Sequence, residues 1–156
     1  LQVPELHRRL GAAGARRGVR GSGEDLERLR ERVARGAPGL VGVGRAVEAL
    51  EGRGSRPGDL VAALGPGIGP CCYEVGEDVR EAFGPDGSAF FRPGPNGRPH
   101  LDVRAANVRH LLEAGLRAEA IHHLAECTRC RADVYPSYRR DGAAAGRMIS
   151  FVGFRP

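Results

Sequence analysis

Apolar residues recur at helical spacing between residues 43 and 50. Val43, Val47 and Leu50 fall on one face of an α-helix, because residues three and four apart are neighbours on its surface. Glycine then enters the sequence at Gly52 and Gly54, and glycine disfavours continuation of a helix. The pattern therefore predicts a helix that buries this face and stops at residues 52–54.

A second helix is predicted after Asp102. Aspartate is a favoured residue at a helix N-cap, where its carboxylate accepts a hydrogen bond from a free backbone N–H. Gly115 suits the left-handed conformation in which many helices end. The apolar positions between these two signals are Val108, Leu111 and Leu112.

Short apolar runs elsewhere predict strands. They cover residues 59–64, 90–91, 120–124 and 147–154, and a further short helix is predicted over 75–83. An Asn-Gly pair within residues 94–97 is typical of a hairpin turn, after which His100 and Leu101 enter a pairing segment. The pattern predicts an α/β fold, a mixed β-sheet flanked by helices, in residues 39–156.

The first 38 residues differ from the rest. Their helix-forming segments have a thin apolar face made by Leu26, Leu29 and Val33. Residues 1–57 hold 12 Arg against 7 acidic residues, whereas residues 58–156 hold 12 of each, so the front carries the whole net charge of +5. No aromatic residue is present there to stack on bases, so binding to nucleic acid is not expected. We interpret residues 1–38 as a basic helical front segment attached to one domain.

Composition sets further limits on the class of protein. The chain of 156 residues is 41% hydrophobic, which is enough for the core of one domain. Apolar runs are shorter than the roughly 18 residues of a membrane-spanning helix, and no signal-peptide pattern opens the chain. We therefore expect a cytoplasmic protein with no membrane partner. All 24 basic residues are arginine, as in a GC-rich coding sequence, which weakens any functional interpretation of the arginine count.

The segment from Tyr138 to Arg147 carries candidate anion-binding residues. Arg139 and Arg140 precede an Asp-Gly turn, and Arg147 opens the last apolar run. Guanidinium forks match the oxygens of phosphate or carboxylate two at a time. The alternative is a structural ion network in which these arginines pair with nearby acids, namely Asp141, Asp133 and Glu126.

Glycine recurs at every second position of another loop, at Gly65, Gly67 and Gly69. Glycine allows close approach of the backbone to a neighbour or a ligand, so the loop itself can form part of a site. The spacing is not that of the dinucleotide-binding fingerprint, and two prolines lie within the loop. A nucleotide cofactor is therefore not expected.

The four cysteines fall in two pairs. Cys127 and Cys130 have the C-x-x-C spacing of zinc ligands, and Cys71 and Cys72 are adjacent. Adjacent cysteines rarely direct both sulfurs at one metal, so thiols that are buried or partly buried are expected, with no metal ligands assigned. Histidines add little, because neighbours such as His122 and His123 face opposite sides of a strand.

Three motifs together resemble the C-terminal part of the laccase-domain family, also described as multicopper polyphenol oxidase-like proteins and as purine nucleoside phosphorylases. They are GPGIGPCCYEV at residues 65–75, SYRRDG at residues 137–142, and the Gly-Arg pair that ends at Arg147. The resemblance implies a zinc-dependent enzyme that cleaves adenosine, inosine or guanosine with phosphate and deaminates adenosine. The older oxidase name implies copper. A cysteine followed by threonine, as at Cys127, belongs to the family signature, and we expect it to form a site wall with the loop glycines.

The same resemblance implies a metal held by two histidines and a cysteine that precede these motifs. Ala34 stands where the second histidine is expected, and the chain contains no tryptophan to complete that motif. One hypothesis is a phosphorylase whose catalytic front is truncated, diverged or supplied by another chain or a homo-oligomer. The other is a non-catalytic remnant of the fold that binds an anion or a partner through Tyr138, Arg139, Arg140 and Arg147.

Overall fold

The structure is a computed structural model that describes residues 41–151. The predicted front segment, residues 1–38, lies outside the described residues, as does the end of the predicted final strand. The described part combines helices with small sheets, so the predicted α/β class is confirmed. No helix within residues 41–151 has the length and apolar character needed to cross a membrane.

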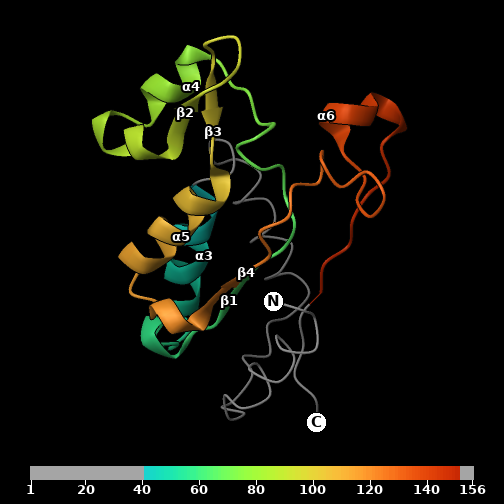
Figure 1. Cartoon of the computed structure of the whole chain (residues 1–156). Coiled ribbons are helices and arrows are strands. Elements are labelled where there is room, and N and C mark those ends of the chain that lie inside the picture. The colour runs from blue at the N-terminus through green and yellow to red at the C-terminus, as the bar shows by residue number, and fades with distance from the viewer. Residues whose placement is uncertain (1–40, 152–156) are drawn as a thin grey trace.

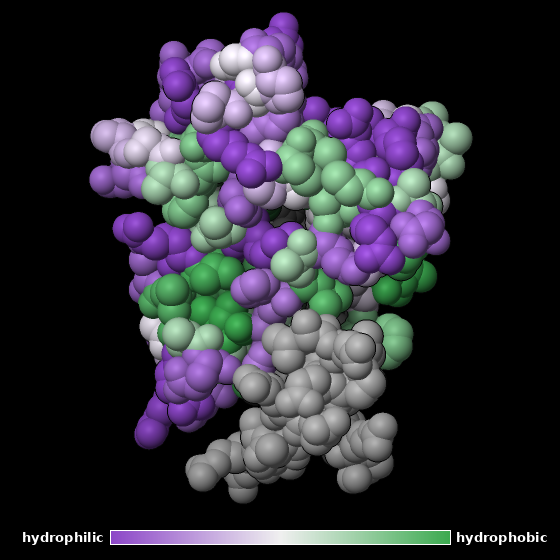
Figure 2. All heavy atoms as spheres, viewed as in Figure 1, coloured by the Kyte–Doolittle hydropathy of each residue, from purple (hydrophilic) through white to green (hydrophobic). Residues whose placement is uncertain are grey.

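Two helices form the body of the fold (Figure 1). They are α3 (Val41–Glu51) and α5 (Val103–Glu113), which pack side by side. Both were predicted from apolar spacing, and both are confirmed. Their contact contains the core cluster of Val47, Leu111 and Leu116. Figure 2 shows an apolar area over these helices, whereas the surface around α6 is hydrophilic.

The signals at the ends of α5 act as expected. The Asp102 carboxylate accepts a hydrogen bond of 2.9 Å from the backbone N–H of Ala105. Gly115 adopts a φ of +89°, a conformation that residues with a Cβ rarely adopt. The chain then turns so that Leu116 re-enters the core.

Two parallel strands lie against this core. Strand β1 (Ala62–Leu64) follows the short 3-10 helix η1 (Pro57–Asp59), and β4 (Ile121–His123) follows η3 (Ala118–Ala120). Ala62 pairs with Ile121 and Leu64 with His123. The side chains of Ala62, Leu64 and Ile121 pack on the helical core. The strands are thus fixed by the same apolar contacts that join α3 and α5.

A hairpin at the other end of α5 forms the second sheet. Strand β2 (Phe91–Pro93) pairs in antiparallel register with β3 (Pro99–Leu101), and Gly97 in the connecting turn has a φ of +78°. The predicted Asn-Gly turn is confirmed. Helix α4 (Glu77–Ala82) and the 3-10 helix η2 (Pro85–Phe90) precede the hairpin, where Phe83 makes edge contacts with Phe90 and Phe91.

Two details differ from the predicted sheet. Within residues 41–151 the strands form two separate two-stranded sheets, not one mixed sheet. Residues 147–151 form no strand, and Ile149 and Phe151 have exposed fractions of 89% and 95%. An apolar run becomes a strand only where a sheet edge accepts its backbone hydrogen bonds. No described strand pairs with this run, so its prediction as a strand is wrong for residues 147–151.

Candidate functional site

The two parallel strands bring separate motifs to one edge. Because β1 and β4 run in the same direction, the loops that follow them leave from the same end of the sheet. Pairing continues beyond the strands, where Gly67 bridges Cys127 and the backbone N–H of Thr128 donates to the Gly67 carbonyl over 3.0 Å. The glycine loop at residues 65–76 therefore lies against the Cys-x-x-Cys turn.

All four cysteines meet at this junction. Their sulfur atoms lie within 4.8 Å of one another, and the four residues are free thiols. The Cys130 sulfur is 3.6 Å from that of Cys71 and 3.4 Å from that of Cys72. A cluster of this kind can hold a metal ion.

The expectation that Cys71 and Cys72 would diverge is not met, because their backbone is not extended. The N–H groups of Cys72 and Tyr73 donate to the Gly69 carbonyl over 2.9 and 3.0 Å, which closes a tight turn. Neighbouring side chains point to opposite sides only in a strand. In this turn both thiols face the cluster.

The surroundings of Cys127 lower the pKa of its thiol. Burial opposes its ionisation, but backbone N–H groups of Gly69, Cys130 and Arg129 favour the thiolate, together with a hydrogen bond from Cys71, and the pKa falls to about 6. The Gly69 N–H donates to the sulfur over 3.2 Å. A Cβ on Gly69 would lie 3.1 Å from the Cys127 Cβ, so glycine permits this approach.

Two other thiols of the cluster, Cys71 and Cys130, have raised pKa values. Burial and hydrogen bonds with Cys127, Cys130 and Cys72 raise the pKa of Cys71 to about 12. The pKa of Cys130 is also raised, chiefly by its contact with Cys72. At neutral pH these pKa values favour a thiolate at Cys127 beside protonated thiols at Cys71 and Cys130.

Arg140 is enclosed by acceptors from its own fold. It lies on α6 (Tyr138–Asp141), which is followed by η4 (Gly142–Ala144). Its Nε and Nη2 donate to the Asp141 carboxylate, each over 2.7 Å, and Nη2 also donates to the Tyr135 carbonyl. Nη1 donates to the carbonyls of Thr128 and Arg129 over 3.0 and 3.1 Å. Five N–H groups are thus engaged, which favours the structural alternative for this residue.

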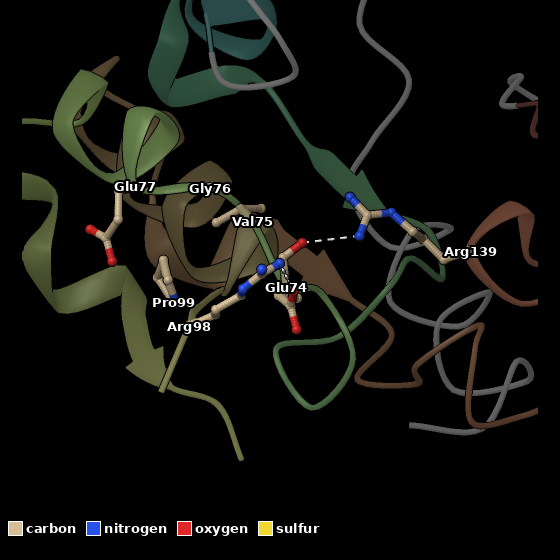
Figure 3. Close-up of a pocket in the computed structure, with 7 residues that line it drawn as sticks. All are labelled: Glu74, Val75, Gly76, Glu77, Arg98, Pro99 and Arg139. Atoms are coloured by element: carbon tan, nitrogen blue, oxygen red, sulfur yellow. Dashed lines mark hydrogen bonds and ion pairs between the residues drawn. The ribbon is translucent and has the colours of Figure 1, made fainter. Parts of the chain in front are cut away.

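Arg139 points the other way, toward the glycine loop. Its Nη1 donates to the Glu74 carbonyl over 3.0 Å (Figure 3). Its guanidinium lies 5.2 Å from the centre of the Tyr73 ring. Within residues 41–151, Nη1 is the one guanidinium nitrogen of Arg139 that donates a hydrogen bond. Arg139 therefore retains N–H groups for a ligand.

A pocket of about 430 Å³ opens beside Arg139. Its opposite side carries Arg98, whose Nη1 lies 3.0 Å from the Glu74 carboxylate. Hydrogen bonds from Asn96 and Arg98 lower the pKa of Glu74. The lining residues are Glu74, Val75, Gly76, Glu77, Arg98, Pro99 and Arg139 (Figure 3). Sequence reasoning missed Arg98, although its position directly after the predicted hairpin turn placed it near the paired segment.

The remaining predicted residues lie away from this pocket lining. Tyr138 has an exposed fraction of 69%, and Arg147 is exposed and donates to the Ala145 carbonyl. Gly65 and Gly67 lie in the loop beside the cysteine cluster. Glu126 and Asp133 pair with Arg131, and Tyr135 donates to Glu126, so these two acids do not pair with the arginines that the structural alternative named.

Within residues 41–151, no histidine joins the cysteine cluster. His100 is buried, and its Nδ1 donates to the Pro70 carbonyl over 2.8 Å, which ties β3 to the glycine loop. His122 and His123 lie on β4. The metal implied by the resemblance needs two histidines and a cysteine, but all four cysteines belong to one cluster to which none of the described histidines contributes. The described residues therefore do not fit that metal set.

Known proteins resemble this chain in sequence. The sequence profile of the family described as multi-copper polyphenol oxidoreductase laccase matches residues 35–155. "Purine nucleoside phosphorylase" from Deinococcus radiodurans is 41% identical over 121 residues, which are 76% of this chain and 45% of that protein. "Purine nucleoside phosphorylase YlmD" from Geobacillus stearothermophilus is 38% identical over 103 residues, which are 64% of this chain and 38% of that protein.

The fold of the chain is also similar to that of a solved structure. The crystal structure of YlmD from Geobacillus stearothermophilus superposes with a TM-score of 0.60 and 34% identity, over 67% of this chain and 41% of that chain. The chain spans less than half the length of these relatives. On the strength of the profile match, the chain belongs to the multi-copper polyphenol oxidoreductase laccase family.

Proposed function

We propose that this chain forms part of a purine nucleoside phosphorylase and that the pocket beside Arg139 binds phosphate or the nucleoside. The observation that carries the proposal is a guanidinium held in place at an open pocket in a member of this family. Relatives bearing the name purine nucleoside phosphorylase support the reaction class.

The contacts of Arg139 suit an oxyanion. The Glu74 carbonyl fixes one Nη1–H, and the Tyr73 ring supports the guanidinium by a cation–π contact. The donors that stay available form a planar fork, which matches two oxygens of a phosphate. Because the fork is already oriented, less conformational freedom is lost when the anion binds.

Phosphorolysis places specific demands on such a site. A phosphate oxygen attacks the anomeric carbon of the ribose, the glycosidic bond breaks, and the departing purine takes up a proton. Holding phosphate near that carbon lowers the barrier mainly by positioning and by stabilising charge. In this proposal Arg139 positions the phosphate. The rest of the site comes from residues outside 41–151 or from another chain.

A non-catalytic anion- or partner-binding module is the second candidate function. One observation favours it: the described residues bring no histidine to the cysteine cluster and do not match the metal set that the resemblance implies. Under this alternative, phosphate still binds at Arg139 but no ribose 1-phosphate is formed. Adenosine deamination is not proposed for the chain alone, since it needs an activated water.

One experiment separates these functions. Release of ribose 1-phosphate from inosine and phosphate is measured, alongside phosphate binding by calorimetry, for the wild type and Arg139→Ala. Arg109→Ala is the matched control, because Arg109 pairs with Glu113 on the surface of α5. We expect Arg139→Ala to weaken phosphate binding by more than about tenfold and the control to leave it unchanged.

The outcomes have distinct meanings. Turnover that Arg139→Ala reduces supports the phosphorylase proposal. Phosphate binding that depends on Arg139 without turnover supports the binding module. Equal binding by the wild type and Arg139→Ala contradicts both, because each assigns the anion to this fork.

A further inference from the structure

We propose that Cys71, Cys72, Cys127 and Cys130 form a structural zinc site that joins the glycine loop to the Cys-x-x-Cys turn. This site is separate from the metal set implied by the family resemblance, since it contains four sulfurs and no histidine. It is also independent of the proposed phosphorylase activity.

The spacing of the sulfurs fits a single tetrahedral ion. Zinc–sulfur bonds of about 2.3 Å place neighbouring sulfurs of a tetrahedron about 3.8 Å apart. The Cys130 sulfur lies 3.6 Å from that of Cys71 and 3.4 Å from that of Cys72, and all four sulfurs fall within 4.8 Å of one another. Small shifts of side chains would therefore complete the tetrahedron.

The chemistry of the donors favours a soft metal ion. Four thiolates form a soft ligand set, which suits zinc and iron, whereas carboxylate and carbonyl oxygens suit magnesium or calcium. A structural zinc site in proteins is closed by four protein ligands, as four cysteines would do here. Each ligating cysteine gives up its thiol proton to solvent when zinc binds, so no oxidant or reductant is needed.

The surroundings of the cluster supply further contacts that metal–thiolate sites need. The Gly69 N–H donates to the Cys127 sulfur over 3.2 Å, and such outer contacts orient a ligand and stabilise its charge. A side chain at position 69 would approach both the Cys127 Cβ at 3.1 Å and the Cys71 sulfur at 3.3 Å. The glycine thus leaves room for the sulfurs to meet.

The fold brings the four ligands together from two separate segments. Ala62 pairs with Ile121 in the parallel strands, and beyond them Gly67 bridges Cys127. This pairing brings the loop with one cysteine pair beside the turn with the other. Three-residue strands in a two-stranded sheet are weak by themselves, so a metal at their end would add substantially to stability.

Two disulfides are the main competing use of four neighbouring cysteines. A disulfide pairs two sulfurs and leaves the others apart, whereas here Cys130 is close to both members of the other pair. The mutual approach of all four sulfurs is what a shared ion requires. We therefore favour metal binding under reducing conditions.

The test begins with the full 156-residue chain purified with a reducing agent that does not bind metal. Elemental mass spectrometry is expected to find about one zinc per chain. Cobalt(II) added after zinc removal is expected to show the absorption of a tetrahedral tetrathiolate site, including thiolate-to-metal charge transfer. Neither readout depends on enzymatic activity, so failure here is distinguishable from failure of the phosphorylase proposal.

Variants then identify the ligands. Cys71→Ser and Cys130→Ser are each expected to weaken zinc binding at least about 100-fold, and Arg129→Ala is the control within the same turn. If the serine variants fail to fold, X-ray absorption of the wild-type zinc protein decides, because four sulfur neighbours at about 2.3 Å are expected.

Several results would overturn the proposal. They are a folded, reduced wild type that binds neither zinc nor cobalt, a metal with nitrogen or oxygen neighbours, iron in place of zinc, and two disulfides in protein kept reduced. Equal loss of zinc in Arg129→Ala and the serine variants would also overturn the ligand assignment.

Discussion

The helical body and the motif loops are held together by different forces. In the body, Val47, Leu111 and Leu116 make an apolar cluster between α3 and α5, on which β1 and β4 pack. In the loops, sulfur–sulfur contacts and the hydrogen bonds of Arg139 and Arg140 hold the segments against one another. Apolar burial specifies that helices pack, whereas directional polar contacts specify where individual groups stand.

This contrast explains why the candidate chemistry lies in the loops. Burial of apolar area tolerates small displacements, but a guanidinium or thiolate functions only when its partners stand at the right distance. Arg140 joins the Cys-x-x-Cys turn to α6, and Arg139 joins α6 to the glycine loop. The adjacent arginines thus connect α6 both to the nearby Cys-x-x-Cys turn and to the glycine loop, which is distant in sequence.

The largest loss of stability is expected from a substitution in the core of the helical body. Leu111→Ala removes a side chain with an exposed fraction of 5% and leaves a cavity against Val47 and Leu116. We expect the free energy of unfolding to fall by about 2–5 kcal/mol in chemical denaturation. Leu112→Ala is the control, because Leu112 has an exposed fraction of 41%. Equal losses for both would contradict the assigned core.

A smaller loss of stability is expected from removing the hydrogen bonds that Arg140 makes to the loops. Arg140→Ala leaves the carbonyls of Thr128, Arg129 and Tyr135 without this donor and Asp141 without its partner. We expect the free energy of unfolding to fall by about 1–3 kcal/mol. Arg139→Ala should cost less, because Nη1 makes the one hydrogen bond of that side chain within residues 41–151. The reverse order would show that Arg139 is the structural residue.

Removing the helix cap should cost less again. Asp102→Ala deletes the acceptor of the Ala105 N–H at the start of α5, and thermal and chemical denaturation should show a loss of about 1 kcal/mol. Asp102→Asn retains an N-cap acceptor and should recover most of the stability. No recovery by asparagine would indicate that the charge of Asp102 matters more than its hydrogen bond.

The smallest loss of stability is expected when the Arg140–Asp141 pair is titrated at acid pH. The hydrogen bond from Arg140 lowers the pKa of Asp141 in the folded protein. The pair's contribution is therefore complete at neutral pH, and it is lost as pH falls below about 3.9, the unfolded value, through the folded pKa. Asp141→Asn should flatten this part of the stability–pH curve. An unchanged slope would mean that other carboxylates determine it.

Sequence patterns predict the body well and the loops only in part. The spacing of Val47 and Leu111 and the cap at Asp102 are local signals, so both helices follow from nearby residues. The meeting of Cys72 with Cys130 depends on parallel pairing between strands far apart in sequence and on a turn at Gly69 that reverses the usual divergence of neighbours. Strand pairing alone would have placed the two cysteine pairs near each other, and the turn at Gly69 is needed to bring the sulfurs together.

The arginines show a similar limit. The spacing of Arg139 and Arg140 predicted two polar side chains in a turn, but the choice between ligand binding and internal pairing depends on which carbonyls surround each one. Those carbonyls belong to Glu74, Thr128 and Tyr135, from different loops. The run at residues 147–151 was predicted as a strand from its apolar composition alone, and composition does not supply a pairing edge.

Hydrogen exchange before and after removal of zinc tests most directly whether the two regions are held by different forces. We expect faster exchange after chelation for the amides of Cys72, Thr128 and Arg131, which donate hydrogen bonds in the motif loops. Amides of α5 should keep their protection, because apolar packing holds that helix. Unchanged loop exchange, or an equal increase in α5, would contradict the account.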